Sequence, residues 1–349
     1  MGRHWTGLAM IKKTNTQTEP VAIDPTEVAI LKTLIEADAY VSGSALAKSI
    51  GISRTTIHTK MDQLKSAGFK INAISNRGYC LEKLPKNLLP QLLQTYGQAL
   101  PKNFQLFFYP SVDSTNLEAE RLFSSGAKTP FAVFTHKQTA GKGRLGRKWH
   151  SQANKNLYCS IMFSPNTPPE KLQSFTLWAG IEVCRSIKAL IPSLDLKIKW
   201  PNDLYCNGKK VSGILTEAKI DSDRMHTIIL GLGLNINSTQ KSFPEEIRSI
   251  ATSLRAETNQ TYDMNVLSIE IIQATIRAYN KCIESNDDES LCDAWDSFDY
   301  LKDQTVALTE NGKKISGLAI GINAYGALQL KTNNGTIRSI HSGDVTLKR

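Results

Sequence analysis

Apolar residues recur at helical spacing near the start of the chain. Val28, Leu31 and Leu34 follow one another at intervals of three, so they line one face of a helix. The segment 24–27 (Asp-Pro-Thr-Glu) precedes this face and supplies a capping aspartate, a proline suited to the first turn and a glutamate at the capping-box position. The pattern predicts a helix that begins at residue 25.

Two further helices are predicted at residues 43–50 and 54–67. Gly51 and Gly68 follow them as stop signals, and Ser53 can cap the second of the two. This second helix has one apolar face, and its opposite face is polar and basic. Its apolar positions are Ile57, Met61 and Leu64.

A hairpin follows the three helices, because residues 69–74 and 79–81 alternate like strands around a turn at 76–78. Helices with this spacing and such a hairpin are typical of a winged helix-turn-helix, whose last helix enters the major groove of DNA. A small helical interaction module with a solvated polar face is the alternative. We predict a DNA-binding domain at residues 23–84, with contacts from Arg54, Thr55, Thr56, His58, Thr59, Lys60 and Arg77.

The middle of the chain alternates strand and helix patterns without a regular βαβ repeat. Long helices are predicted at 172–190 and 264–283, and a shorter one near 87–96. The stretch 291–300 closes the unit. We therefore expect a mostly antiparallel or mixed sheet with helices packed on it, over residues 85–302. The predicted strands are 104–109, 131–134, 157–163, 194–198, 213–216 and 227–231.

The pattern changes after residue 303. Five short strands, separated by Gly- and Asn-containing turns such as 310–312, are predicted within residues 303–349. So many short strands in so little chain suggest a small closed barrel.

Composition narrows the function classes. The formal net charge is +10, which favours polyanionic partners without proving any. The six cysteines contain no Cys-x-x-Cys pair, which disfavours a zinc site or a disulfide framework and fits a reducing cytoplasm. No run approaches the roughly 18 apolar residues of a membrane span. Residues 1–22 are expected to be a flexible tail, and either Met1 or Met10 could be the native start.

Residues 138–149 carry the strongest chemical signal. Gly141, Gly143 and Gly146 alternate with Lys142, Arg144, Arg147 and Lys148 in this segment. Glycines let backbone N–H groups face a ligand, and the cations supply charge for a phosphate or an acyl phosphate. The segment alone is compatible with three roles: a phosphate site, a solvated basic loop or a nucleic-acid contact.

A second segment, 199–203 (Lys-Trp-Pro-Asn-Asp), follows a predicted strand. Pro201 ends the strand and Asn202 with Asp203 turns the chain, so Lys199 is delivered at a rigid corner. By itself this segment could equally be a buried tryptophan beside a surface lysine.

Four blocks occur in order along the chain: 113–116 (Asp-Ser-Thr-Asn), 138–149, 199–203 and 231–237 (Gly-Leu-Gly-Leu-Asn-Ile-Asn). Together they closely resemble the biotin–protein ligases. The resemblance covers nearly the whole chain. The N-terminal part is similar to that of the bifunctional ligase and biotin-operon repressor. The resemblance implies an α+β fold with a winged helix-turn-helix, a central sheet of the class II synthetase type and an SH3-like C-terminal barrel.

The resemblance also implies an activity. ATP and biotin would give biotinyl-5′-AMP with Mg²⁺, and biotin would pass to a lysine of the biotin carboxyl carrier protein of acetyl-CoA carboxylase. The adenylate would act as corepressor, promoting a homodimer on biotin operator DNA, in the cytoplasm and without a membrane. A lipoate-type ligase, or a biotin-sensing transcription factor with weak ligase activity, is the alternative.

Site residues follow from the same resemblance. Joining two anions requires cations, so Arg144, Lys199 and Lys142 are the predicted catalytic residues. Asp203 is a weak candidate for holding the metal. The family loop usually has arginine where Lys142 stands, so we expect altered retention of the intermediate. Biotin would contact Ser114, Thr115, Asn116, Gln138, Lys142, Gly143, Arg144 and Lys199, and the adenylate would contact Gly141, Arg147, Trp149, Asn202 and Asn235.

Overall fold

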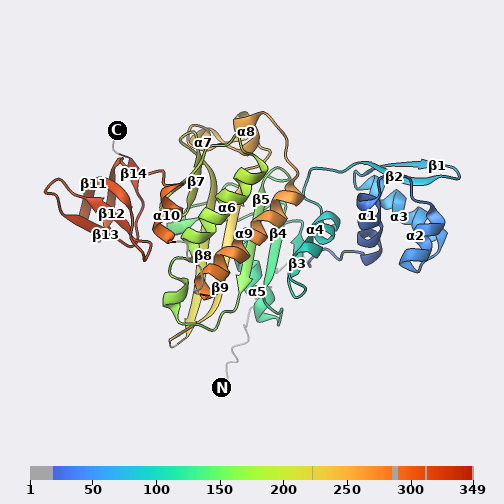
Figure 1. Ribbon diagram of the computed structural model, residues 1–349, viewed down its shortest axis with the longest axis horizontal. Helices are drawn as coiled ribbons and strands as arrows, with labels where there is room; N and C mark the ends of the chain where they lie inside the picture. The colour runs from blue at the N-terminus through green and yellow to red at the C-terminus, as the bar shows by residue number, and fades with distance from the viewer. Residues whose placement is uncertain (1–18, 222, 285–289, 311–312, 348–349) are drawn as a thin grey trace, which may run out of the picture.

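The computed structural model describes residues 19–221, 223–284, 290–310 and 313–347. Three units follow one another along its longest axis (Figure 1): a small helical module, a central sheet covered by helices, and a small C-terminal sheet. The predicted tail at 1–22 lies mostly outside the described residues. So does part of the predicted turn at 310–312.

The helical module has the predicted elements. It consists of α1 (Pro25–Glu36), α2 (Gly43–Ile50), α3 (Arg54–Ser66), and a hairpin of β1 (Lys70–Ile74) and β2 (Gly78–Lys83). Asp24, Ser42 and Ser53 each accept a bond from a first-turn backbone N–H. The hairpin turn requires a glycine, because Gly78 has φ +108° and a Cβ there would lie 2.1 Å from the Val41 carbonyl oxygen.

Glu27 differs from the expectation that it would complete a capping box. Its Oε1 accepts a bond from Lys60 Nζ at 3.3 Å, and its Oε2 accepts one from Gln91 Nε2 at 3.1 Å. Gln91 belongs to α4 (Pro90–Tyr96), the first helix of the central unit. Leu92 of α4 is fully buried in the core of the helical module. The module is therefore docked on the central unit through both apolar and polar contacts.

The central sheet is mixed, as predicted. Its order is β3-β4-β5-β9-β8-β7-β6, and every neighbouring pair is antiparallel except β3 and β4. The strands are β3 (Gln105–Tyr109), β4 (Phe131–Thr135), β5 (Leu157–Phe163), β6 (Leu196–Lys199), β7 (Asp203–Cys206), β8 (Lys209–Asp221) and β9 (Arg224–Leu234).

Each face of the sheet has its own helices, since successive strand residues point to opposite sides. Ala132 and Phe134 belong to the large core beneath α6 (Phe175–Leu190) and α9 (Met264–Glu284), which lie across the sheet in Figure 1. Phe131 and Val133 belong to a smaller core under α5 (Thr115–Ser124). The face that α5 covers is therefore open beyond the amino end of this helix.

Several boundaries differ from the sequence-based ones. Strands β8 and β9 form one long hairpin rather than two short segments, and β7 was not predicted. Helix α6 begins at Phe175, after a separate 3-10 turn at Pro169–Leu172, and α4 begins at Pro90. The remaining helices are α7 (Glu245–Arg248), α8 (Leu254–Thr258) and α10 (Leu291–Asp296), with other 3-10 turns at Gly97–Ala99, Arg144–Gly146 and Gln240–Ser242.

The C-terminal unit contains the five predicted strands in one antiparallel sheet. Its order is β13-β12-β11-β10-β14, and among the described residues β13 does not pair with β14. The sheet is therefore open, and the expected closed barrel is not observed. The strands are β10 (Thr305–Glu310), β11 (Lys313–Ile322), β12 (Leu328–Lys331), β13 (Ile337–Ile340) and β14 (Thr346–Leu347).

Within the described part of the chain, no helix is both long and apolar enough to cross a membrane.

Glu27→Ala should loosen the helical module. Glu27 is buried, so its removal leaves Lys60 and Gln91 without this acceptor, at a cost of about 1–3 kcal/mol. Hydrogen exchange should show faster exchange of amides in α1 and α3, with β8 and β9 unchanged. Glu36→Ala, at the exposed end of the same helix, is the matched control. Equal protection in both variants would contradict the bridging role of Glu27.

Candidate active site

One pocket of about 460 Å³ lies on the open face of the central sheet. Its floor comes from β8 and β9, and one end is formed by the start of α5. The segment 142–150 passes over it, and residues 343–346 of the C-terminal unit close one side. Four segments that are far apart in the sequence therefore meet at one site.

The α5 end of the pocket is a network of polar side chains. Thr115 donates to Gln138 Oε1 from its backbone N at 3.0 Å and from its hydroxyl at 3.2 Å. Asn116 Nδ2 donates to Glu217 Oε2 at 2.6 Å, and the Ser160 hydroxyl lies 2.5 Å from Asn116 Oδ1. Donors and acceptors are thus fixed in place, as recognition of a polar ring system requires.

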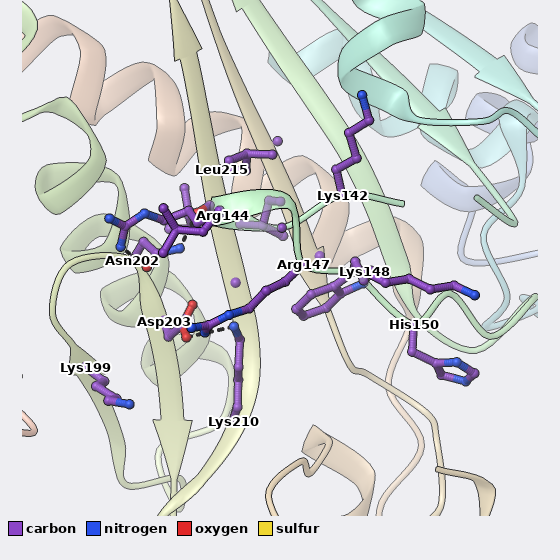
Figure 2. Close-up of a pocket in the computed structure, with 18 of the residues that line it drawn as sticks. Lys142, Arg144, Arg147, Lys148, His150, Lys199, Asn202, Asp203, Lys210 and Leu215 are labelled. Atoms are coloured by element: carbon purple, nitrogen blue, oxygen red, sulfur yellow. Dashed lines mark hydrogen bonds and ion pairs between the residues drawn. The ribbon is translucent and has the colours of Figure 1, made fainter. Parts of the chain in front are cut away.

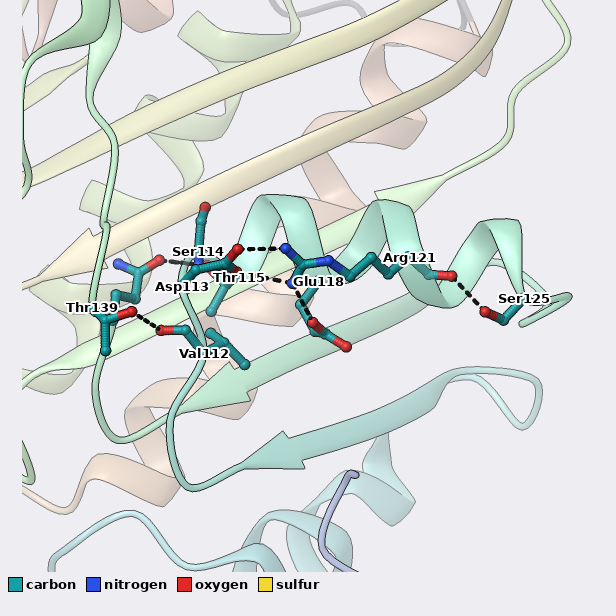
Figure 3. Close-up of polar contacts among 9 residues, drawn as sticks. Val112, Asp113, Ser114, Thr115, Glu118, Arg121, Ser125 and Thr139 are labelled. Atoms are coloured by element: carbon teal, nitrogen blue, oxygen red, sulfur yellow. Dashed lines mark hydrogen bonds and ion pairs between the residues drawn. The ribbon is translucent and has the colours of Figure 1, made fainter. Parts of the chain in front are cut away.

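An ion pair anchors the segment that carries this network (Figure 3). Arg121 of α5 binds both carboxylate oxygens of Asp113, and its bond to Oδ1 measures 2.9 Å. The Asp113 carboxylate also accepts from Ser114 N, and its backbone carbonyl accepts from Ala140 N at 2.8 Å. The bond from Arg121 lowers the pKa of Asp113 below its usual range. Asp113 therefore ties the α5 end of the pocket to the start of the glycine-rich segment.

The glycine-rich segment folds back on itself. Gly143 N donates to the Arg147 carbonyl at 2.7 Å, and Trp149 N donates to the Gly141 carbonyl at 2.9 Å. Leu145, at its tip, is 74% exposed and has φ +56°, a conformation that costs about 1 kcal/mol or more for a non-glycine residue. The tip of the segment is therefore exposed and conformationally strained.

Cations gather in the middle of the pocket. Lys210 Nζ pairs with Asp203 at 2.7 Å, and Arg147 pairs with Asp344 of the C-terminal unit. Arg144 Nη1 donates to Asn202 Oδ1 at 3.2 Å. Figure 2 shows Arg147 and Lys210 extending toward Asp203, whereas Lys142 and Lys148 point away from this group.

Burial changes the titration of this cluster. It lowers the pKa of Arg144 and of Lys199, although the negative charges of Asp203 and Asp344 counteract the shift. Burial also acts to raise the pKa of Asp344, but the hydrogen bond and charge of Arg147 outweigh it, and the net shift is downward. The cations are thus held in a partly dehydrated site, where their attraction for an anion is strengthened.

Trp149 lies flat on the sheet at the other end of the pocket. A Cβ at Gly233 would be 2.4 Å from its ring, and one at Gly213 would be 3.0 Å from it. Lys210 Nζ lies 5.4 Å from the centre of the same ring. Trp149 Nε1 is buried without a hydrogen-bond partner among the described residues, so a ligand could supply one.

The comparisons with known proteins agree with this geometry. Residues 108–235 match the Biotin/lipoate A/B protein ligase family, 27–80 an HTH domain, and 303–348 the Biotin protein ligase C terminal domain. The bifunctional ligase/repressor BirA of Bacillus subtilis is 31% identical over 309 residues, which cover 88% of this chain and 94% of that protein. The chain belongs to this family of ligases.

Two further relatives support the assignment. BirA of Escherichia coli is 28% identical and covers 88% of this chain and 92% of its own length. The biotin protein ligase from Aquifex aeolicus, solved in complex with biotin and ATP, has a TM-score of 0.60 and 30% identity. That alignment covers 70% of this chain and 99% of the Aquifex chain.

The pocket of this ligase-family chain contains almost all of the predicted ligand contacts. Gly141 is the exception, because it is buried beneath the segment, where a Cβ would lie 3.0 Å from the Trp149 carbonyl oxygen. Lys142 lines the pocket, but its side chain is exposed. The predicted residues that line the pocket are Ser114, Thr115, Asn116, Gln138, Lys142, Gly143, Arg144, Arg147, Trp149, Lys199, Asn202 and Asn235.

Sequence reasoning missed Lys210 and the polar residues behind the α5 end, Ser160 and Glu217. A signal for Lys210 was present, because Asn207-Gly208 is a two-residue hairpin turn that brings Lys210 back opposite Tyr205. From there its side chain reaches Asp203. Ser160 and Glu217 lie on separate strands, and no local pattern marks them. Asp344, from the C-terminal unit, was missed for the same reason.

The predicted DNA contacts separate into two groups. Arg54, Thr55, His58 and Thr59 are exposed on α3, and Arg77 is exposed in the hairpin turn, whereas Thr56 is half-buried. Lys60 differs, because its ammonium group pairs with Asp24 at 2.5 Å and with Glu27, and its side chain is only 18% exposed. The structure therefore argues against Lys60 as a DNA contact.

Gly233→Ala should displace Trp149, since the new Cβ would overlap its ring. Acrylamide should then quench more of the tryptophan fluorescence, because Trp178, Trp200 and Trp295 are buried and change little. The background should carry Trp5→Phe, which removes the tryptophan outside the described residues.

The matched control for this prediction is Gly143→Ala, whose new Cβ would meet nothing closer than 3.5 Å. If Gly233→Ala and Gly143→Ala show the same quenching, the glycine floor does not hold Trp149.

Proposed function

We propose that this protein activates biotin with ATP to biotinyl-5′-AMP and transfers the biotinyl group to a lysine of a biotin carboxyl carrier protein. One observation carries the proposal: a single pocket holds a fixed polar network at one end, cations in the middle and a tryptophan on a glycine floor at the other. Biotin, phosphate and adenine need these three environments in this order.

The first step is electrostatically demanding. A carboxylate oxygen of biotin attacks the α-phosphorus of ATP, and the bond to pyrophosphate breaks. Both reactants are anionic, so the cations must screen them and stabilise the charge that develops in the transition state. Lys210 and Arg144 are placed for this, and we assign Lys210 a larger role than Lys199 because it adjoins both Asp203 and Trp149.

The described side chains supply few ligands for a metal ion. Among the described residues, no group of three or more His, Cys, Asp or Glu side chains could hold an ion. Asp203 Oδ1 is buried without a partner and could contribute one oxygen. We therefore propose Mg²⁺ only as the counterion that arrives with the nucleotide phosphates.

A second role follows from the helical module. We propose that it binds biotin operator DNA as a repressor, with biotinyl-5′-AMP as corepressor and a homodimer as the binding form. The exposed polar face of α3, the HTH match and the similarity to BirA support this. We also propose that the protein is located in the cytoplasm. We propose further that the C-terminal strands are related to those of an SH3-like fold.

The ligase activity is tested with biotin, Mg·ATP and a carrier domain. We expect the carrier to gain the mass of one biotinyl group, together with biotin-dependent pyrophosphate exchange. Lys210→Ala should slow that exchange at least about tenfold, because one fixed charge at a reacting phosphate supplies a few kcal/mol. Mass gain with lipoate and none with biotin would instead support the lipoate alternative.

Lys148→Ala is the matched control for Lys210→Ala. It removes a lysine from the edge of the same pocket, but this side chain is exposed and points away from Asp203 (Figure 2). Exchange that falls equally in both variants would refute a specific role for Lys210.

The DNA-binding role is tested by footprinting the region upstream of biotin-synthesis genes, with and without biotin and ATP. Protection should require both compounds. Arg54→Ala should weaken binding and reduce the slope of log K against log [salt] by about one phosphate contact. Lys32→Ala, an exposed lysine on α1, should leave the slope unchanged. Equal protection with and without ligands would remove the corepressor claim.

A further inference from the structure

A second cavity of about 230 Å³ lies between the central unit and the C-terminal sheet. Thr176 and Leu177 line it from the start of α6, and Gln173 lines it from just before that helix. The C-terminal unit contributes the turn 325–327 and His341. Residues of both the central unit and the C-terminal unit therefore line this cavity.

This cavity shares a wall with the active-site pocket, because Arg144 and Asn202 line both. Asn202 is held firmly, since its Nδ2 donates to the Ile214 carbonyl at 2.7 Å and its own carbonyl accepts from Ile214 N at 2.9 Å. Arg144 rests against it through one hydrogen bond of 3.2 Å. The shared wall is thus formed by a firmly bonded asparagine and by the arginine of the glycine-rich segment.

The turn at the mouth is preorganised. Asn323 Oδ1 accepts from Tyr325 N and Ala327 N, both at 3.0 Å, and Trp200 Nε1 donates to the Gly326 carbonyl at 3.0 Å. Gly326 has φ +82°, and a Cβ there would lie 2.5 Å from Leu177. The turn therefore holds Tyr325 outward, where it is 70% exposed.

The lining suits an unbranched chain that ends in a neutral amine. Leu177, Pro201 and Ala327 are apolar, while Thr176 and Thr216, whose hydroxyl groups lie 2.8 Å apart, are neutral and polar. No carboxylate is among the described residues that line the cavity, and Arg144 is positive. A positive wall disfavours an ammonium ion and favours the deprotonated amine, which is the nucleophilic form.

We propose that this cavity is the passage through which the acceptor lysine reaches the adenylate, with Tyr325 and His341 contacting the chain around that lysine. The inference rests on the proposed ligase function. The adenylate occupies the first pocket during transfer, so the amine needs a separate approach. Its nitrogen lone pair attacks the acyl carbon, and the bond from that carbon to the phosphate oxygen breaks. AMP leaves with the electron pair, and the amide nitrogen releases its extra proton to solvent.

His341→Trp tests the passage, because it narrows the mouth at an exposed position. Three readouts separate the steps: biotin-dependent pyrophosphate exchange, capture of the adenylate by hydroxylamine as biotinyl hydroxamate, and transfer to the carrier domain. Exchange and hydroxamate formation should stay within about twofold of wild type, since hydroxylamine is small. The kcat/KM for the carrier should fall at least about tenfold, or about 1.4 kcal/mol.

Ser339→Trp is the matched control, because it introduces the same side chain at an exposed position of β13 that does not line the cavity. Tyr325→Ala is a second variant with little risk to folding, and it should raise the KM for the carrier with unchanged exchange. Carrier transfer at the wild-type rate in both His341→Trp and Tyr325→Ala would overturn the passage. A wild-type protein without exchange would instead overturn the ligase function, and the passage with it.

Discussion

The site depends on the absence of side chains at three positions of one hairpin. Gly231 and Gly233 on β9 and Gly213 on β8 leave the sheet surface bare. A Cβ at Gly231 would lie 2.2 Å from Asn116 Oδ1, and the other two glycines support the ring of Trp149. The side chains at both ends of the pocket therefore pack directly against the backbone of the sheet. A larger residue at any of these positions would push a site residue off the floor.

Electrostatics sets the second constraint. The pocket concentrates cations, and repulsion between them would open it unless carboxylates intervened. Asp203 pairs with Lys210, and Asp344 pairs with Arg147 from the C-terminal unit. This arrangement also makes the C-terminal unit part of the site, which is consistent with the cavity that it shares with α6.

Contacts between the units give the fold a route for coupling. Leu92 of α4 is buried in the core of the helical module, and Gln91 binds Glu27, which in turn binds Lys60 of α3. A chain of packed and bonded residues therefore runs from the central unit to α3. Removal of the module would expose the apolar face of α4, so point substitutions are the cleaner way to separate the two activities.

The sequence by itself determined the features that depend on residues close to one another along the chain. Helix caps at Asp24 and Ser53, the winged hairpin and the glycine-rich segment were all predicted, because each is fixed by residues a few positions apart. Tertiary structure alone decided the rest. It brought Lys210 beside Trp149, turned Lys60 away from solvent, left the C-terminal sheet open and created the second cavity. These outcomes depend on packing and charge between segments that are distant in the chain, and no local pattern records them.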